Sequence, residues 1–221
     1  MLNGVIFDMD GVLLDNVDYH VEAFLRLGRE EVEPFGRAQV LKVFGRRNSE
    51  MLPALFSRPL SLAEAKRLGE RKEAIYREII RPHLASSLVP GVVELLHGLQ
   101  VQRFRLAVAT SGPPENVELV LEGLGDGCSF DAVVTGDQAS KGKPDPEIFL
   151  LAAQRIEVEP RECLVFEDSL SGVAAARSAG CFCVALSTTH SRPELEEVAP
   201  DRIILDFREV PAGNLEQWLK T

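Results

Sequence analysis

The chain has 221 residues, 45% of them hydrophobic, which is enough for a full core and one modest extra subdomain. Its formal net charge of −10 argues against a nucleic acid or an anionic membrane as partner, because such partners require basic surfaces. No stretch has the length of a membrane span or the pattern of a secretory signal, so we expect a cytoplasmic protein, and a monomer, although the sequence does not determine the oligomeric state.

The first predicted element is a short apolar strand at residues 4–7, followed by two acids, Asp8 and Asp10. Side chains alternate along a strand, so the two carboxylates would share a face if the extended geometry persisted. Carboxylates this close repel each other unless a cation or a proton lies between them. A hard divalent ion prefers oxygen ligands, so the run is a candidate Mg²⁺ and phosphate site, or else a strand that ends in a polar turn.

Residues 16–85 form an insertion far longer than the connection between two strands requires, and they show helical patterning throughout. One helix is predicted over 17–31, and a capping box of Ser61 with Glu64 begins another that runs towards Ile80. A helical subdomain inserted at this point would cover the strand ends as a lid does. We predict hinges near 14–16 and 82–88, a core of residues 1–15 and 86–221, and a helical cap of residues 16–85.

The rest of the chain alternates apolar runs with helical stretches. Strands are predicted at 105–109, 132–135, 164–166, 182–186 and 203–205. Pro90 is predicted at the first position of one helix and Pro146 at the start of another. This alternation is typical of an α/β fold with a parallel sheet covered by helices. The cysteines and histidines lack the spacing of a metal site, and Cys181 and Cys183 are predicted to be core residues.

Polar motifs follow or flank three of these strands. They contain Thr110 with Ser111, then Lys143, then Glu167 with Asp168. A hydroxyl and a lysine can neutralise phosphoryl oxygens, and further acids can complete an oxygen cage around a metal. Each motif alone could be a turn hydroxyl, a solvated lysine or a helix N-cap. Together, at the ends of strands, they favour a phosphoryl site.

The chain resembles the haloacid dehalogenase-like hydrolase superfamily, in the subgroup with a helical cap that includes β-phosphoglucomutase and many small-metabolite phosphatases. It carries all four superfamily motifs: DMDGV at 8–12, Thr110, Lys143 in GKPDPEIF, and FEDS at 166–169. The resemblance covers essentially the whole chain. It implies a Rossmann-like three-layer core, Mg²⁺ as cofactor, and phosphoryl transfer through an aspartyl-phosphate.

The same resemblance implies a role for each motif residue. Asp8 would be the nucleophile, and Asp10 the acid that protonates the leaving oxygen and later deprotonates the hydrolytic water. The phosphate would be held by Thr110 and Lys143, with Ser111 and the backbone N–H groups of Gly11 and Val12 beside it. The Mg²⁺ ligands would be Asp8, the backbone carbonyl of Asp10, Asp168 and, directly or through water, Glu167.

Cap residues are implied more weakly. His20, Arg46 and Lys72 match positions near the substrate in the β-phosphoglucomutase-like pattern, although each also has an ordinary reading as a packing or solvated residue. In that role Arg46 would bind the distal, non-reacting end of the substrate, for example a second anionic group. Two departures weaken the mutase analogy: Pro114 replaces a polar residue, and Asn16 replaces the more usual Ser or Thr.

Three functions remain open at this point. The first is a Mg²⁺-dependent phosphomonoesterase that acts on a small phosphorylated metabolite, such as a sugar or polyol phosphate. The second is a β-phosphoglucomutase-type phosphotransferase, which would share every core residue. The third is a catalytically silent binding protein on the same fold, which would be expected to have lost Asp8, Asp10 or Asp168. Dehalogenation is disfavoured, because the dehalogenases of the superfamily lack the second acid.

Overall fold

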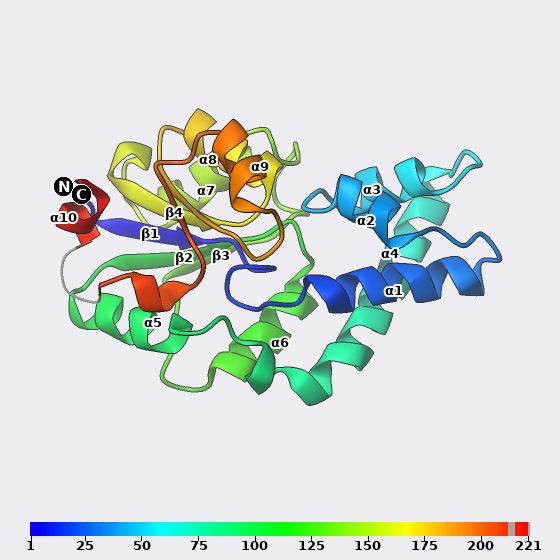
Figure 1. Cartoon of the computed structure of the whole chain (residues 1–221), viewed down its shortest axis with the longest axis horizontal. Helices are drawn as coiled ribbons and strands as arrows, with labels where there is room; N and C mark the ends of the chain where they lie inside the picture. The colour runs from blue at the N-terminus through cyan, green and yellow to red at the C-terminus, as the bar shows by residue number, and fades with distance from the viewer. Residues whose placement is uncertain (212–214, 221) are drawn as a thin grey trace.

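The computed structural model describes residues 1–211 and 215–220, and within them the chain forms one six-stranded parallel sheet (Figure 1). The strand order is β3-β2-β1-β4-β5-β6, and every neighbouring pair is parallel. The strands are β1 Gly4–Phe7, β2 Arg105–Ala109, β3 Ala132–Val134, β4 Cys163–Glu167, β5 Phe182–Leu186 and β6 Arg202–Ile204. The order reverses between β1 and β4, so their carboxyl ends form the crevice in which open α/β sheets bind ligands.

Helices cover both faces of this sheet, which confirms the three-layer core. Residues on one face, such as Val5 and Phe7, join one hydrophobic cluster, whereas Ile6 joins the other. Figure 1 shows the two helical layers on opposite sides of the strands. The helices are α5 Val92–Val101, α6 Pro114–Leu124 and α10 Leu215–Lys220 on the first face, and α7 Glu147–Arg155, α8 Leu170–Ser178 and α9 Arg192–Glu197 on the second.

Small differences separate these elements from the predicted ones. Strand β4 is longer than predicted, and β6 begins and ends one residue earlier. The prediction that Pro90 is the first residue of a helix is wrong, because α5 begins at Val92. Gly91 lies between them with a positive φ of 84°, which is not a right-handed helical conformation. Pro146 is the residue that caps α7. Cys181 and Cys183 are buried in the second cluster, as predicted.

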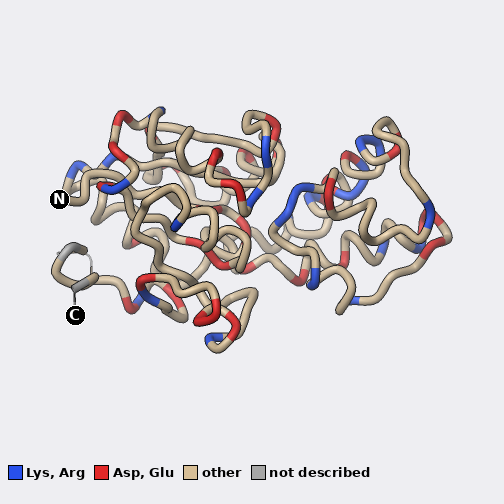
Figure 2. Tube along the Cα trace, turned by 90° about the horizontal axis from the view of Figure 1, so that it is seen from above, with Lys and Arg blue, Asp and Glu red and all other residues tan. Residues whose placement is uncertain are grey.

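The inserted segment is helical, as predicted, and lies to one side of the sheet (Figure 1). Its helices, which we call the cap, are α1 Val17–Glu30, α2 Arg37–Val43, α3 Asn48–Leu55 and α4 Leu62–Ile80. The capping box of Ser61 and Glu64 begins α4. Figure 2 shows basic and acidic residues interspersed over the cap, where pairs such as Arg71 with Glu30 join α4 to α1.

The two connections between the cap and the sheet lie beside each other. The backbone N–H of Asp15 donates to Ser87 O at 2.7 Å, and that of Val89 donates to Leu13 O at 3.1 Å. These bonds fall within or next to both predicted hinges, and the division at residues 15/16 and 85/86 stays a prediction. In the part of the chain that the structure describes, no helix is long and apolar enough to cross a membrane.

Candidate active site

Asp8 is the first residue after β1, and it lies at the crevice between β1 and β4. Its backbone N–H donates to Phe166 O at 2.9 Å, and its Oδ1 lies 2.6 Å from Lys143 Nζ. The same ammonium lies 2.5 Å from Glu167 Oε1. Burial lowers the pKa of Lys143, but the carboxylates of Asp8 and Glu167 raise it by more, so the pKa lies above its usual range. A buried lysine therefore stays charged beside the predicted nucleophile.

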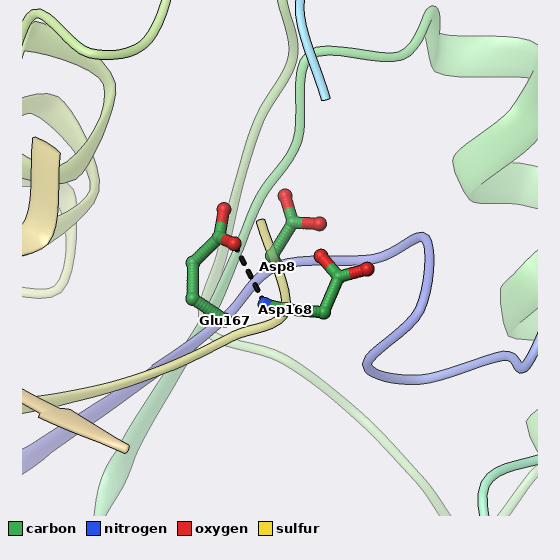
Figure 3. A group of neighbouring side chains, drawn as sticks. All are labelled: Asp8, Glu167 and Asp168. Atoms are coloured by element: carbon green, nitrogen blue, oxygen red, sulfur yellow. Dashed lines mark hydrogen bonds between the residues drawn. The ribbon is translucent and has the colours of Figure 1, made fainter. Parts of the chain in front are cut away.

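Three carboxylates meet at this point, those of Asp8, Glu167 and Asp168 (Figure 3). One oxygen of each lies within 4.8 Å of the others, and all three residues are buried. Burial and the neighbouring carboxylates raise the pKa of Asp8 and of Asp168, so the cluster favours a bound cation that would keep both ionised. Carboxylate oxygens are ligands that suit Mg²⁺. The Asp10 carboxylate is directed elsewhere, so any Asp10 ligand to the metal would be its backbone carbonyl.

Glu167 has bonds besides the one with Lys143. Its Oε2 accepts from the backbone N–H groups of Asp168 and Ser169, each at 2.7 Å, and the first of these is the dashed line in Figure 3. Ser169 in turn caps α8 by accepting from the backbone N–H of Gly172. Glu167 thus fixes both the lysine and the start of the helix that follows β4.

Two glycines make room for these acids. A Cβ on Gly11 would lie 1.9 Å from Asp168 Oδ2, and one on Gly172 would lie 1.7 Å from Glu167 Oε1. Gly11 also has a φ of +75°, which turns the chain back after Asp10. Thr189, in the loop after β5, donates to Asp168 Oδ2 and orients that carboxylate.

The Asp10 carboxylate is held by residues of the hinge and the cap. Its Oδ1 lies 2.6 Å from Asn16 Nδ2 and 3.0 Å from His20 Nε2. Burial opposes ionisation, but His20 and these hydrogen bonds keep the pKa of Asp10 below its usual range. Lys72 Nζ lies 2.6 Å from His20 Nδ1, and because an ammonium only donates, Nδ1 is the acceptor in this contact.

The remaining residues predicted to hold phosphate lie at the end of β2. Thr110 is 1% exposed, and its backbone N–H donates to Val134 O. Ser111 Oγ donates to Gly45 O of the cap at 3.3 Å. A cavity of about 50 Å³ adjoins these groups, and most of the predicted site residues line it: Asp8, Asp10, His20, Arg46, Lys72, Thr110, Ser111, Lys143 and Asp168.

The backbone N–H groups of Gly11 and Val12 have partners inside their own loop, and their predicted contacts with phosphate stay a prediction. The backbone N–H of Gly11 donates to Leu14 O and Asn16 Oδ1, and that of Val12 donates to Met9 O. The left-handed turn at Gly11 directs these groups into the loop itself.

Sequence reasoning missed several residues of the site. Asn16 departs from the family pattern, yet it holds Asp10. Thr189 was not singled out, although it follows a predicted strand, which is the signal that identified the other motifs. Glu73, which also lines the cavity, is not predicted, because nothing in its local sequence distinguishes a buried polar residue from a solvated one.

Comparison with known proteins agrees with this geometry. The family model of haloacid dehalogenase-like hydrolases matches residues 2–180. The chain is 35% identical over 215 residues to the validoxylamine A 7'-phosphate phosphatase of Streptomyces hygroscopicus subsp. limoneus, which covers 95% of this chain and 96% of that protein. It is 38% identical to the phosphorylated carbohydrates phosphatase of Thermotoga maritima, covering 81% and 82% of the two chains. It is 32% identical to the β-phosphoglucomutase of Bacillus subtilis, covering 83% and 82%.

The fold and the site together define an α/β phosphoryl-transfer enzyme with a helical cap. The chain belongs to the haloacid dehalogenase-like hydrolase family. Within it, the chain is an enzyme of the phosphatase and phosphotransferase kind.

Proposed function

We propose that this protein is a Mg²⁺-dependent phosphomonoesterase that acts on a small phosphorylated sugar or polyol through an aspartyl-phosphate at Asp8. The observation that carries the proposal is the pairing of Asp8 with the buried Lys143, next to Asp168 and within reach of a cavity that Asp10 also lines. Two phosphatase relatives support the substrate class, since one is named for phosphorylated carbohydrates.

The first chemical step joins Asp8 to the substrate phosphorus. An Asp8 carboxylate oxygen attacks, the bond from phosphorus to the leaving oxygen breaks, and a proton on Asp10 passes to that oxygen. Lys143 and Thr110 offset the charge on the non-bridging oxygens. A bound Mg²⁺, held by Asp8, Asp168 and Glu167 with the Asp10 carbonyl, would supply further neutralisation of that charge.

The second step releases phosphate. Asp10 removes a proton from water, the water oxygen attacks phosphorus, and the bond between phosphorus and the Asp8 oxygen breaks. The pairing of Asp10 with His20 favours the ionised carboxylate, which is the form that this step needs. The leaving-group step in turn requires Asp10 to gain a proton first.

A β-phosphoglucomutase-type phosphotransferase is the second candidate, because one relative of 32% identity carries that name. In that case the phosphoryl group on Asp8 would pass to another substrate hydroxyl instead of water. Pro114 has no N–H to offer a substrate, which favours the phosphatase. A catalytically silent binding protein is disfavoured, since Asp8, Asp10 and Asp168 are all present.

The test is phosphate release from a panel of phosphorylated sugars, polyols and nucleotides with Mg²⁺, run beside a glucose 6-phosphate readout from β-glucose 1-phosphate. We expect rapid phosphate release from a few related compounds, and a loss of several orders of magnitude in Asp8→Asn. Asp126→Asn, which changes an exposed acid, is the control. Glucose 6-phosphate without free phosphate would identify the mutase, and near wild-type turnover in Asp8→Asn would exclude both.

A further inference from the structure

The cap helix α4 carries a buried acid, Glu73, which is 6% exposed and is not among the predicted site residues. Its Oε1 accepts from Asn48 Nδ2 of α3 at 2.6 Å and from Lys72 Nζ at 2.9 Å. Its Oε2 accepts from Asn116 Nδ2 at 2.8 Å. Because Asn116 belongs to α6, which covers the sheet, this last bond joins the cap to the core.

Asn116 is held by α4 at both ends of its amide. It is 1% exposed, and its Oδ1 accepts from Arg77 Nη1 at 2.9 Å. Residues 73 and 77 are one helical turn apart, so Glu73 and Arg77 reach the same neighbour from one side of α4. By contrast, Arg81 and Glu122, which join the end of the cap to α6, are 58% and 59% exposed, and such pairs contribute little.

Glu73 also lies between the catalytic cavity and a second, larger groove. It lines the catalytic cavity, and it lines a groove of about 720 Å³ between the cap and residues 111–115. If α4 moved away from α6, the carboxylate would lose Asn116, and the catalytic cavity would open towards this groove. A buried acceptor that loses its partner is costly, so the contact favours the arrangement seen here.

The acid is also connected to the reaction through its neighbour. Lys72, which Glu73 pairs with, lies against His20, and His20 faces Asp10. Glu73 therefore fixes the direction of the Lys72 ammonium, which in turn fixes the ring nitrogen of His20 that faces Asp10.

We propose that Glu73 and Asn116 lock the cap onto the core, and that Glu73 is a positioning residue that holds Lys72 and His20 in place beside Asp10. The kinetic part of the test rests on the proposed function. The scattering part does not, because cap closure is measured without substrate.

The first test compares Asn116→Ala with Arg81→Ala, which removes the exposed ion pair between the same parts of the chain. Small-angle X-ray scattering of the unliganded proteins is expected to show a larger radius of gyration for Asn116→Ala only. On the best substrate of the panel, kcat of Asn116→Ala is expected to fall about tenfold, the factor of one buried hydrogen bond, with a smaller change in KM. Wild-type scattering and wild-type kcat for folded Asn116→Ala would overturn the proposal.

A second pair of variants keeps the volume of the contact unchanged. Glu73→Gln replaces one of the two acceptor oxygens by an amide NH2 group, which opposes the N–H groups of Asn116 when the remaining oxygen faces Asn48 and Lys72, so we expect an enlarged radius and a lower kcat. Adding Asn116→Asp restores an acceptor opposite the new amide and beside Arg77, and is expected to restore the compact radius while kcat stays low, since Lys72 still lacks its acid. If the double variant were as expanded as Glu73→Gln, the proposed lock between Glu73 and Asn116 would be overturned. If the double variant recovered the full kcat, the proposed positioning role of Glu73 would be overturned. If the wild type released no phosphate, the proposed function would fail while the scattering result still tested the lock.

Discussion

Substitution of Gly172 by alanine tests the account of Glu167 most directly. Gly172 lies in the first turn of α8, where alanine would ordinarily stabilise a helix by about 1 kcal/mol. Here a Cβ would lie 1.7 Å from Glu167 Oε1 and 1.9 Å from its carboxyl carbon, so the carboxylate would have to move. We therefore expect Gly172→Ala to destabilise the protein.

The magnitude follows from what Glu167 would lose. Its bonds include Lys143 Nζ at 2.5 Å and the backbone N–H groups of Asp168 and Ser169. Disrupting a buried ion pair costs about 3–5 kcal/mol, which leaves a net loss of about 2–4 kcal/mol after the helix gain. For a chain of this size that corresponds to a melting temperature lower by about 5–15 °C.

The assay is urea unfolding followed by circular dichroism, together with phosphate release. Gly123→Ala is the matched control, because Gly123 is also helical and its Cβ would meet only Leu84, whose Cβ would lie at 3.5 Å, an ordinary contact. We expect Gly123→Ala to be unchanged or slightly more stable with full activity, and Gly172→Ala to lose activity as Lys143 shifts. If both variants were equally stable and equally active, the described contacts of Glu167 would not hold that acid in place.

Three further predictions concern the metal, the substrate and pH. Mg²⁺ at about 100 times its Kd should stabilise the wild type by about 2.7 kcal/mol in thermal unfolding, and Asp168→Asn, like addition of a chelator, should remove most of that gain; an undiminished gain would place the ion elsewhere. Arg46→Ala should raise KM for substrates with a second anionic group but hardly for p-nitrophenyl phosphate, and equal effects on both would remove Arg46 from the substrate site. Although burial opposes ionisation, Lys72 holds the pKa of Glu73 below its usual range, so the carboxylate stabilises the fold above about pH 4.3 and that contribution is lost as pH falls through the lowered pKa. The stability difference between wild type and Glu73→Gln, measured by urea unfolding, should therefore shrink on acidification, and a difference that grows would contradict this sign.

The sequence by itself predicted the sheet, the covering helices and the main acids, because each of these has a local signal. Apolar runs of strand length alternate with helical patterns, and parallel strands bring their carboxyl ends to one edge. Asp8, Thr110 and Asp168 could therefore be assigned to one site before any geometry was known. The ends of the elements were predicted less well. Pro90 was expected to begin a helix, but the left-handed conformation of Gly91 places the start of α5 after it, at Val92.

Only the tertiary structure decided which groups touch within the site. Glu73 and Asn116 are 43 residues apart in the chain, and they meet because α4 packs next to α6. Thr189 likewise meets Asp168 from 21 residues away, and Asn16 meets Tyr76 from 60 residues away. The amides of Gly11 and Val12 show the converse, because backbone groups that a family pattern assigns to phosphate are used inside their own loop. Hydrogen-bond partners depend on packing between distant segments, and that packing has no local signature in the sequence.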